Sequence, residues 1–582
     1  MNLWMYMFLV LSAADPAGEQ LNRLFDNVRD WRAREYPIFA THQGIHDHND
    51  KLASMKLADL KRRTADLHGF LTRLDAIPAA ELTHQERISA DIFRDLLEDE
   101  IRDFDLGGYA LTLTSDYGFH IEMVGLPDIA PFRNTKDYEN YLARLERMPA
   151  YFGEHIDLLR MGLKRGWTLP KEALSKYSGT ISAHVLEDPT ESAFYAPFKS
   201  FPATVSEADR ARLDKAGKAA IGKHVIPAYR TFLKFMDETY IPGARKTIGA
   251  SQMEDGKNYY RHVIRRYTTL DLDPKDVHEM GLAEVKRIRA EMLKVIEQTG
   301  FEGDFAAFLN FLRTDPRFYA KTPEELLKEA AYLSKKMDGK LPSLFKTLPR
   351  QPYGVEPVPD YLAPGYTGGR YVPASIESTR PGTYWVNTYN LESRPLYVLE
   401  ALTLHEAVPG HHLQSALSQE LSELPAFRRN LYLSAFGEGW ALYSEWLGLE
   451  AGFYQDPYSN FGRLTYEMWR ACRLVVDTGI HAMGWTRQQS IDYLAKHTAL
   501  SIHECTTETD RYICWPGQAL SYKIGELKIK ALREKAEREL GVHFDRRQFH
   551  DAVLANGCVP MPILEREIDR FIEVNKTNQT AP

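Results

Sequence analysis

Apolar residues recur at spacings of three and four along most of the chain, which is the pattern of amphipathic helices. In one segment, Asp273-Pro274 offers a helix cap and a first-turn proline, an apolar stripe follows, and Gly300 ends it. A second stripe runs from Ile226 to Tyr240. We therefore predict a mainly α-helical protein whose core is formed by these stripes.

The helical pattern is interrupted between residues 349 and 382, where seven prolines and five glycines exclude long helices. The β-branched and aromatic residues from 383 to 389 then predict a strand, and residues 370–375 offer a partner for it. A helix is expected to begin near Pro395. We predict a small antiparallel sheet beside this helix, an arrangement that can hold an extended peptide by strand addition.

A chain of 582 residues is longer than one hydrophobic core usually serves, so two lobes are expected. We place an N-terminal helical lobe at residues 15–270 and a catalytic lobe at residues 271–582. Lys and Arg number 72 against 80 Asp and Glu, which gives a net charge of −8. This balance argues against a nucleic-acid-binding protein, because such proteins need a basic surface.

The N-terminus carries a short apolar run over residues 3–14, below the roughly 20 residues that span a bilayer. Small residues end the run, but no Lys or Arg precedes Arg23. We interpret residues 1–14 as a truncated signal peptide, which implies a periplasmic or secreted protein; the alternative is a hydrophobic helix segment in a cytoplasmic protein. No later run is long enough for stable membrane insertion, so the mature protein should be soluble. The oligomeric state stays open.

The segment 404–414 contains the strongest chemical signal in the chain. In the zincin motif His-Glu-x-x-His, two histidines one helical turn apart bind a metal and the glutamate polarises a water. Here His405 and Glu406 are followed by Pro409 at the usual second position, and the next histidines are His411 and His412. The motif is therefore present in an expanded form.

Helix geometry leaves two candidates for the second ligand. At about 100° per residue, His411 would lie about 240° around a regular helix from His405, and His412 only about 20° from it. Pro409-Gly410 argues against a regular helix, because proline removes a backbone donor and clashes with the preceding turn. If these two residues form a bulge, His411 becomes the ligand. We prefer His411 and keep His412 as the alternative.

A catalytic zinc needs a third protein ligand. The segment 436–445 supplies Glu438, flanked by glycines that allow close helix packing, and Glu445 seven residues later. We assign Glu438 as the ligand. Glu445 is the alternative, or a partner that orients a ligating histidine.

Four blocks of sequence together resemble a bacterial family long catalogued as a domain of unknown function and placed among the gluzincin-like metallopeptidases: 405–414, 438–445, 473–481 and 516–525. Residues 272–274 and 380–387 extend the likeness over most of the chain. More distantly, the segment 410–414 looks like part of the zinc motif in thimet-type oligopeptidases and thermostable carboxypeptidases, which also favours His411. The resemblance implies an elongated helical body split by a deep cleft, with zinc at its floor, that admits short unfolded peptides.

Hydrolysis at zinc also needs a donor to the oxyanion and groups that hold the substrate. Arg470, Arg473 and Arg511 are suited to bind a substrate carboxylate. An equally good interpretation is that these arginines form ion pairs with local acids such as Asp477 and Asp510. The candidate donors are His481, Tyr512, which lies in a segment resembling the donor segment of related peptidases, and Tyr522. The candidate substrate-binding residues are Asn387, Tyr389, Arg470, Arg473, Arg511 and Tyr522.

These observations predict a zinc-dependent metallopeptidase of short peptides. His405, His411 and Glu438 would hold Zn²⁺, and Glu406 would act as the general base. Two alternatives remain: a peptide-binding pseudoenzyme whose Pro-Gly insertion prevents metal binding, and a zinc hydrolase of other amides or esters. Zinc is preferred over manganese or cobalt on ligand type alone.

Overall fold

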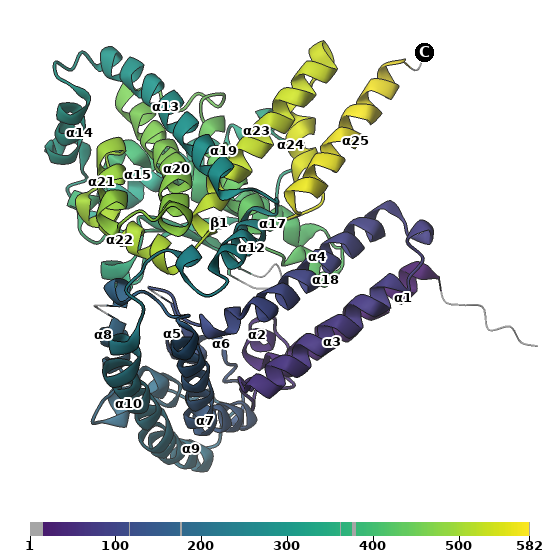
Figure 1. Cartoon of the computed structure of the whole chain (residues 1–582), viewed down its shortest axis with the longest axis vertical. Helices are drawn as coiled ribbons and strands as arrows, with labels where there is room; N and C mark the ends of the chain where they lie inside the picture. The colour runs from purple at the N-terminus through teal and green to yellow at the C-terminus, as the bar shows by residue number, and fades with distance from the viewer. Residues whose placement is uncertain (1–15, 116, 175–176, 361, 375–379, 581–582) are drawn as a thin grey trace, which may run out of the picture.

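The chain folds into two groups of helices, shown one above the other in Figure 1. The computed structural model describes residues 16–115, 117–174, 177–360, 362–374 and 380–580, so the expected signal peptide lies outside the described residues. The lower group includes α1 (Ala17–Glu35), α3 (Leu57–Asp75), α4 (His84–Leu106), α7 (Thr135–Arg165), α9 (Glu207–Ala220) and α10 (Ile226–Phe235). The prediction of a mainly helical protein is confirmed.

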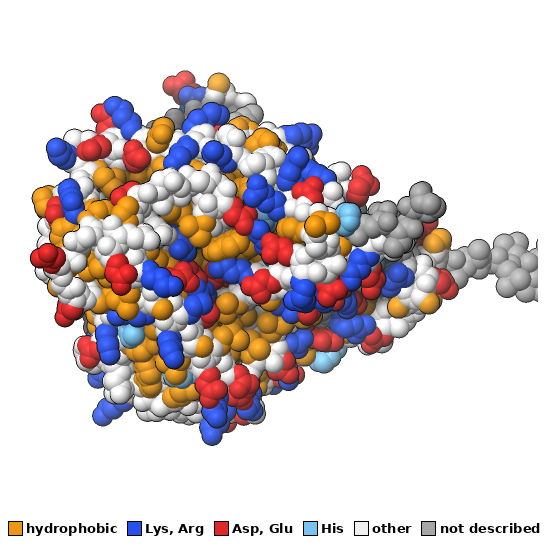
Figure 2. Space-filling model, turned by 90° about the horizontal axis from the view of Figure 1, so that it is seen from above, with side chains coloured by type: hydrophobic (Ala, Val, Ile, Leu, Met, Phe, Trp, Pro, Cys, Tyr) orange, Lys and Arg blue, Asp and Glu red, His pale blue; other side chains and the backbone are white. Residues whose placement is uncertain are grey.

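The upper group contains α17 (His411–Glu420), which includes the second part of the predicted motif. Its longer helices are α13 (Pro274–Thr299), α15 (Pro323–Asp338), α19 (Ser434–Leu447), α20 (Pro457–Met483), α22 (Ile502–Cys514), α23 (Ser521–Leu540) and α25 (Met561–Thr580). Helix α13 begins and ends as its sequence predicts, because Asp273 accepts a hydrogen bond from the Lys275 amide and Gly300 adopts a left-handed φ of 68°. Figure 2 shows basic and acidic side chains interspersed on the face seen from above.

The two groups of helices are joined by hydrophobic contacts and by ion pairs. Tyr229 of the lower group and Met468 of the upper group belong to one continuous cluster of buried side chains. Arg265 of α12 (Gly256–Thr268) lies 2.7 Å from Asp95 of α4, and Arg266 lies 2.8 Å from Asp99. The lobe boundary at residues 270 and 271 stays a prediction, since the core runs across it.

The sheet has three strands in the order β1-β3-β2, formed by β1 (Tyr353–Pro357), β2 (Gly369–Val372) and β3 (Gly382–Val386). The predicted pair, β2 and β3, is antiparallel, while β1 pairs parallel with β3. The sheet is therefore mixed rather than antiparallel. Strand β1 was not predicted, because it is short, contains Gly354 and ends at Pro357, and this composition is more typical of a loop. The end of the predicted partner, Ser375, lies outside the described residues.

The predicted strand at residues 383–389 corresponds to β3, which is the central strand of the sheet. β3 has a neighbour on each side, so it has no free edge for another strand. The edge strand beside the motif is β2, which packs against helix α16 (Leu399–Glu406). Over the described residues, no helix combines the length and the apolar composition needed to cross a membrane.

Candidate metal centre

The expanded motif folds as two helices separated by a tight turn. Helix α16 (Leu399–Glu406) ends directly after the first histidine and glutamate, and helix α17 (His411–Glu420) begins at the next histidine. The intervening residues contain a cis bond between Val408 and Pro409. The Gly410 amide donates to the Leu404 carbonyl at 3.1 Å, six residues back, instead of continuing the helical ladder. The predicted Pro-Gly bulge is confirmed.

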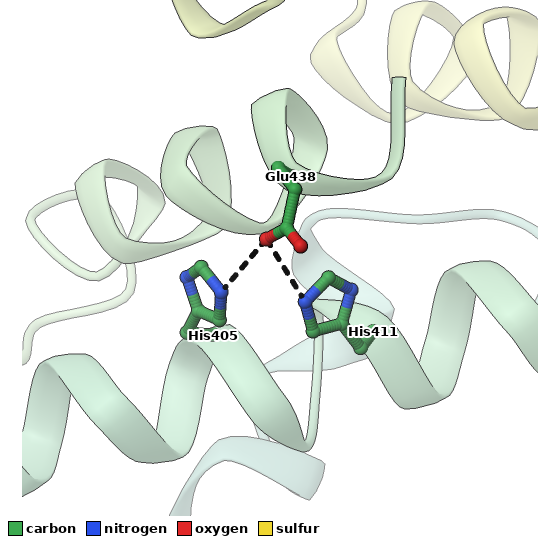
Figure 3. A group of neighbouring side chains, drawn as sticks. All are labelled: His405, His411 and Glu438. Atoms are coloured by element: carbon green, nitrogen blue, oxygen red, sulfur yellow. Dashed lines mark ion pairs between the residues drawn. The ribbon is translucent and has the colours of Figure 1, made fainter. Parts of the chain in front are cut away.

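The bulge brings His411 to the same place as His405, and Glu438 of α19 meets both from the opposite side (Figure 3). Glu438 Oε2 lies 3.5 Å from His405 Nε2 and 3.4 Å from His411 Nε2. One donor atom from each residue lies within 4.8 Å of the other two. Two imidazoles and one carboxylate converging in this way form a donor set that suits zinc and leaves room for a further ligand.

The two alternatives kept open by the sequence have other contacts. His412 is buried among the sheet residues, where its Nδ1 lies 3.1 Å from the Tyr371 hydroxyl and its Nε2 lies 3.1 Å from the Gln351 carbonyl oxygen. Glu445 lies behind His405, with its Oε1 2.7 Å from Nδ1. A carboxylate at this position fixes the orientation of the imidazole and leaves Nε2 free for a metal.

The electrostatics of the cluster favour a cation. Burial would lower the pKa of His405, but the carboxylates of Glu438, Glu445 and Glu406 raise it to about 9. Burial would raise the pKa of Glu438, yet His405 and His411 hold it well below its usual value. Three carboxylates around two imidazoles therefore create a local excess of negative charge, which a divalent ion would neutralise.

Glu406 is held between the motif helix and the sheet. Its Oε2 accepts a hydrogen bond of 2.8 Å from the Tyr371 amide of β2, and its side chain is 8% exposed. Its other carboxylate oxygen has no hydrogen bond to the described residues, and Glu406 lines the cleft. One oxygen is thus anchored while the other can accept a proton.

Close helix packing sets the height of Glu438 above the histidines. Gly439 follows Glu438 on α19 and lies directly against the backbone of Gly525 on α23. A side chain carbon at Gly439 would lie 2.5 Å from the Gly525 Cα, well inside van der Waals contact. The prediction that a glycine beside Glu438 allows close helix packing is confirmed for Gly439.

The cluster lies in a cleft of about 2700 Å³ whose walls come from both groups of helices. Asp95 and Asp99 of α4 contribute to one wall, and the edge strand β2 contributes Gly369, Arg370 and Tyr371 to another. The expected deep cleft is therefore present, with the three donor residues along its lining.

Two of the predicted oxyanion donors lie away from the cleft lining, which is a correction to the sequence analysis. His481 is fully buried, and its ring nitrogens lie 3.0 Å from the Ala250 amide and 2.9 Å from the Tyr512 carbonyl oxygen. The Tyr512 hydroxyl is occupied by Trp469, Arg473 and Glu508. Both side chains serve to join α20 to α22 and its neighbours.

The predicted substrate-binding residues divide into two groups. Tyr389 and Tyr522 line the cleft, and Tyr389 is 51% exposed. Asn387 also borders the cleft, but its side-chain amide is used to hold the loop of residues 363–367 and the Tyr389 amide.

The predicted carboxylate-binding arginines are also partly occupied. Arg473 and Arg511 both pair with Glu508, at 3.1 and 3.2 Å. Both arginines therefore form ion pairs, as the alternative interpretation expected. Their partner is Glu508 rather than Asp477 or Asp510.

Tyr432 is a site residue that the sequence analysis missed. It lies in the loop before α19, lines the cleft, and donates a hydrogen bond of 2.9 Å to Glu438 Oε1. Its ring lies directly over Gly437, where a larger residue would collide with it. A lone tyrosine six residues before a candidate ligand gives no sequence signal, so only the fold could reveal this contact.

The fold and the site define a mainly helical protein with a two-histidine, one-glutamate cluster in a large cleft. Residues 37–568 match the family described as bacterial protein of unknown function (DUF885). The chain belongs to this family. A comparison with curated proteins gave no match.

Two solved structures share the fold over nearly their whole length. The crystal structure of "the putative lipoprotein from Colwellia psychrerythraea" has a TM-score of 0.89 and 28% identity, covering 96% of this chain and 99% of that one. A "putative lipoprotein of unknown function from Shewanella oneidensis" has a TM-score of 0.69 and 19% identity, with coverage of 95% and 99%. The second likeness concerns the fold alone.

Proposed function

We propose that this protein is a zinc-dependent metallopeptidase of the gluzincin-like kind that hydrolyses short, unfolded peptides. The observation that carries the proposal is the convergence of His405, His411 and Glu438 on one point beside Glu406. Two further contacts argue against an accidental cluster. Glu445 orients the His405 ring, and the Tyr371 amide donates a hydrogen bond to Glu406.

In this proposal, His405, His411 and Glu438 hold the ion. Bound zinc would supply Lewis acidity, which polarises a carbonyl group and lowers the pKa of water towards about 7. Glu406 accepts the proton of the attacking water and later passes it to the leaving amine. The Tyr371 amide keeps one oxygen of Glu406 fixed during these transfers, since it donates to Oε2.

The cleft supports peptides as the substrate class. Its size is sufficient for several residues of an extended chain, and β2 offers an edge strand along its wall. A folded protein would have to present a protruding segment to reach the cluster, so short unfolded peptides suit this site best.

We also propose an extracytoplasmic location. The Colwellia psychrerythraea structure, which is 28% identical, is described as a lipoprotein in its title, and the apolar run of residues 3–14 suits an export signal.

The proposal is tested by metal analysis followed by a mixed peptide library. We expect about one zinc per chain, loss of cleavage after chelation, and recovery when zinc is restored. Mass spectrometry of the products identifies the bonds that are cut. A protein with stoichiometric zinc that cleaves esters or other amides but no peptide would be the alternative zinc hydrolase. A protein that binds peptides, but does not bind metal and does not cleave the peptides, would be the pseudoenzyme.

Tyr432 provides a separate prediction about the metal centre. Its hydroxyl holds Glu438 Oε1, which leaves Oε2 directed at the histidines. Tyr432→Phe should therefore fold normally but bind zinc about ten- to hundredfold more weakly, as is typical when a contact to a metal ligand is lost. Competition with a chelator measures this affinity.

The matched control is Tyr389→Phe, which removes a hydroxyl from a similarly exposed cleft tyrosine without a hydrogen bond to the three donors. Equal zinc affinities in the two variants would contradict the role assigned to Tyr432.

A further inference from the structure

A second polar group lies in the cleft beside the metal cluster. We call it the arginine recess and define it as Arg394, Arg470, Arg473 and Glu504, all of which line the cleft. Arg470 and Arg473 lie one turn apart on α20, Glu504 lies on α22, and Arg394 lies in the segment between β3 and α16. Three separate parts of the chain thus bring these four side chains together.

The arginines surround Glu504 without forming an ion pair with it. Burial and Glu508 raise the pKa of Glu504 to about 7, while the charges of Arg394, Arg470 and Arg473 act in the opposite direction. All three guanidinium groups are therefore close enough to act on this carboxyl. Yet among the described residues Glu504 has no side-chain hydrogen bond and no ion pair within 4.0 Å. Glu504 therefore forms no direct ion pair with any of the three guanidinium groups, although all four residues line the cleft.

The positive charge of the recess is poorly compensated. Arg394 has no carboxylate partner among the described residues, and its contact is with the Tyr366 carbonyl oxygen at 3.3 Å. Arg470, only 4% exposed, lies 3.4 Å from Glu445, a carboxylate already engaged by His405. Arg473 shares Glu508 with another arginine.

Individual donor atoms in the recess also lack partners. Arg394 Nε, Arg470 Nε and Arg473 Nη1 are buried without a hydrogen bond in the described structure. Buried charged donors without a partner are rare, because leaving them unpaired is costly. Trp469 and Tyr522 stack on the Arg473 guanidinium at 4.2 and 4.3 Å, which holds its plane in place. The recess is thus a rigid, cationic site built before any ligand arrives.

We propose that the arginine recess binds the free C-terminal carboxylate of a short peptide, with Arg394 as its accessible contact. This inference rests on the proposed peptidase function and names its substrate class. Guanidinium groups bind carboxylates through paired, charge-assisted hydrogen bonds. Burial raises the pKa of Glu504, which reduces the repulsion that its carboxyl exerts on such a group.

The recess and the metal cluster line the same cleft. Arg470 lies 3.4 Å from Glu445, and Glu445 lies 2.7 Å from His405 Nδ1, so the two groups are also linked behind the histidine. A peptide whose C-terminal carboxylate is anchored in the recess would therefore present its C-terminal part to the cluster, and we expect C-terminal fragments among the products.

The experiment compares two peptides of one sequence, one with a free C-terminal carboxylate and one with a C-terminal amide. For the unaltered, zinc-loaded enzyme we expect kcat/KM to favour the free acid by roughly tenfold or more, mainly through KM. Arg394→Gln should remove this preference by weakening the free acid alone. Arg394→Lys, which keeps the charge, should retain part of it.

The matched control is Arg487→Gln, because Arg487 also lines the cleft but is paired with Asp510 at 2.6 Å. It should keep the preference for the free acid. An unchanged preference in Arg394→Gln, in protein that unfolds at the same temperature, overturns the assignment of Arg394.

Binding of both peptides to zinc-loaded Glu406→Gln protein, measured by calorimetry, separates the two proposals. If the unaltered, zinc-loaded protein cleaves neither peptide, but the variant still binds the free acid more tightly than the amide, the peptidase function is refuted and the recess is supported. If both peptides are cleaved and bound equally well, the function stands and the recess is refuted.

Discussion

Glu406→Gln should keep zinc but lose peptidase turnover, with kcat falling about a hundred- to ten-thousandfold, the usual contribution of a general base. Glutamine still accepts the hydrogen bond from the Tyr371 amide, so the turn and the sheet keep their places. What it cannot do is take a proton from water. Initial rates on a peptide substrate, together with zinc content and thermal unfolding, measure the three quantities separately.

The same substitution elsewhere in the cleft provides the control. Glu392 also lines the cleft, is exposed, and lies outside the metal cluster. Glu392→Gln should therefore leave zinc content unchanged and turnover within about a factor of two, since isolated surface changes are usually small in effect. Full activity in Glu406→Gln would remove the general-base assignment while leaving the metal site untouched.

His411→Ala should abolish stoichiometric zinc binding and, with it, all cleavage. Removing one of three protein ligands leaves two, which is too few to hold a catalytic zinc ion. The zinc content of the purified variant, measured after dialysis against a weak chelator, should fall from about one per chain to near zero.

The adjacent histidine is the natural control for this variant. His412 contacts Tyr371 and Gln351 rather than the cluster, so His412→Gln should keep zinc, with a loss of stability as its main effect. The reverse result would be loss of zinc from His412→Gln and retention of zinc by His411→Ala. It would make His412 the ligand and would contradict the described turn.

Local sequence signals predicted the parts of the fold that depend on neighbours in the chain. The Asp273 cap and Gly300 set the ends of α13, because caps act within one helical turn. Pro409 and Gly410 predicted the break between α16 and α17 for the same reason. Strand β1 was missed, since its pairing with β3 is a long-range property that its own composition opposes.

The candidate site was predictable where residue type and spacing limit the choices. The clustering of His405, His411 and Glu438 could be predicted because few residue types are suited to bind metals and a turn restricts their geometry. His481 and Tyr512 were misplaced because a histidine or tyrosine that joins two helices looks the same in sequence as one that faces a cleft. Contacts such as Tyr432 with Glu438, or Arg394 near Glu504, depend on loops whose paths the sequence does not determine.

The contact between Gly439 and Gly525 has a consequence for how such a protein can drift through mutation. Neither residue has a side chain, yet a methyl group at either one would force α19 away from α23. Glu438, next in the chain to Gly439, would be carried off with its helix. The position of the Glu438 carboxylate thus depends on two residues that carry no functional group of their own.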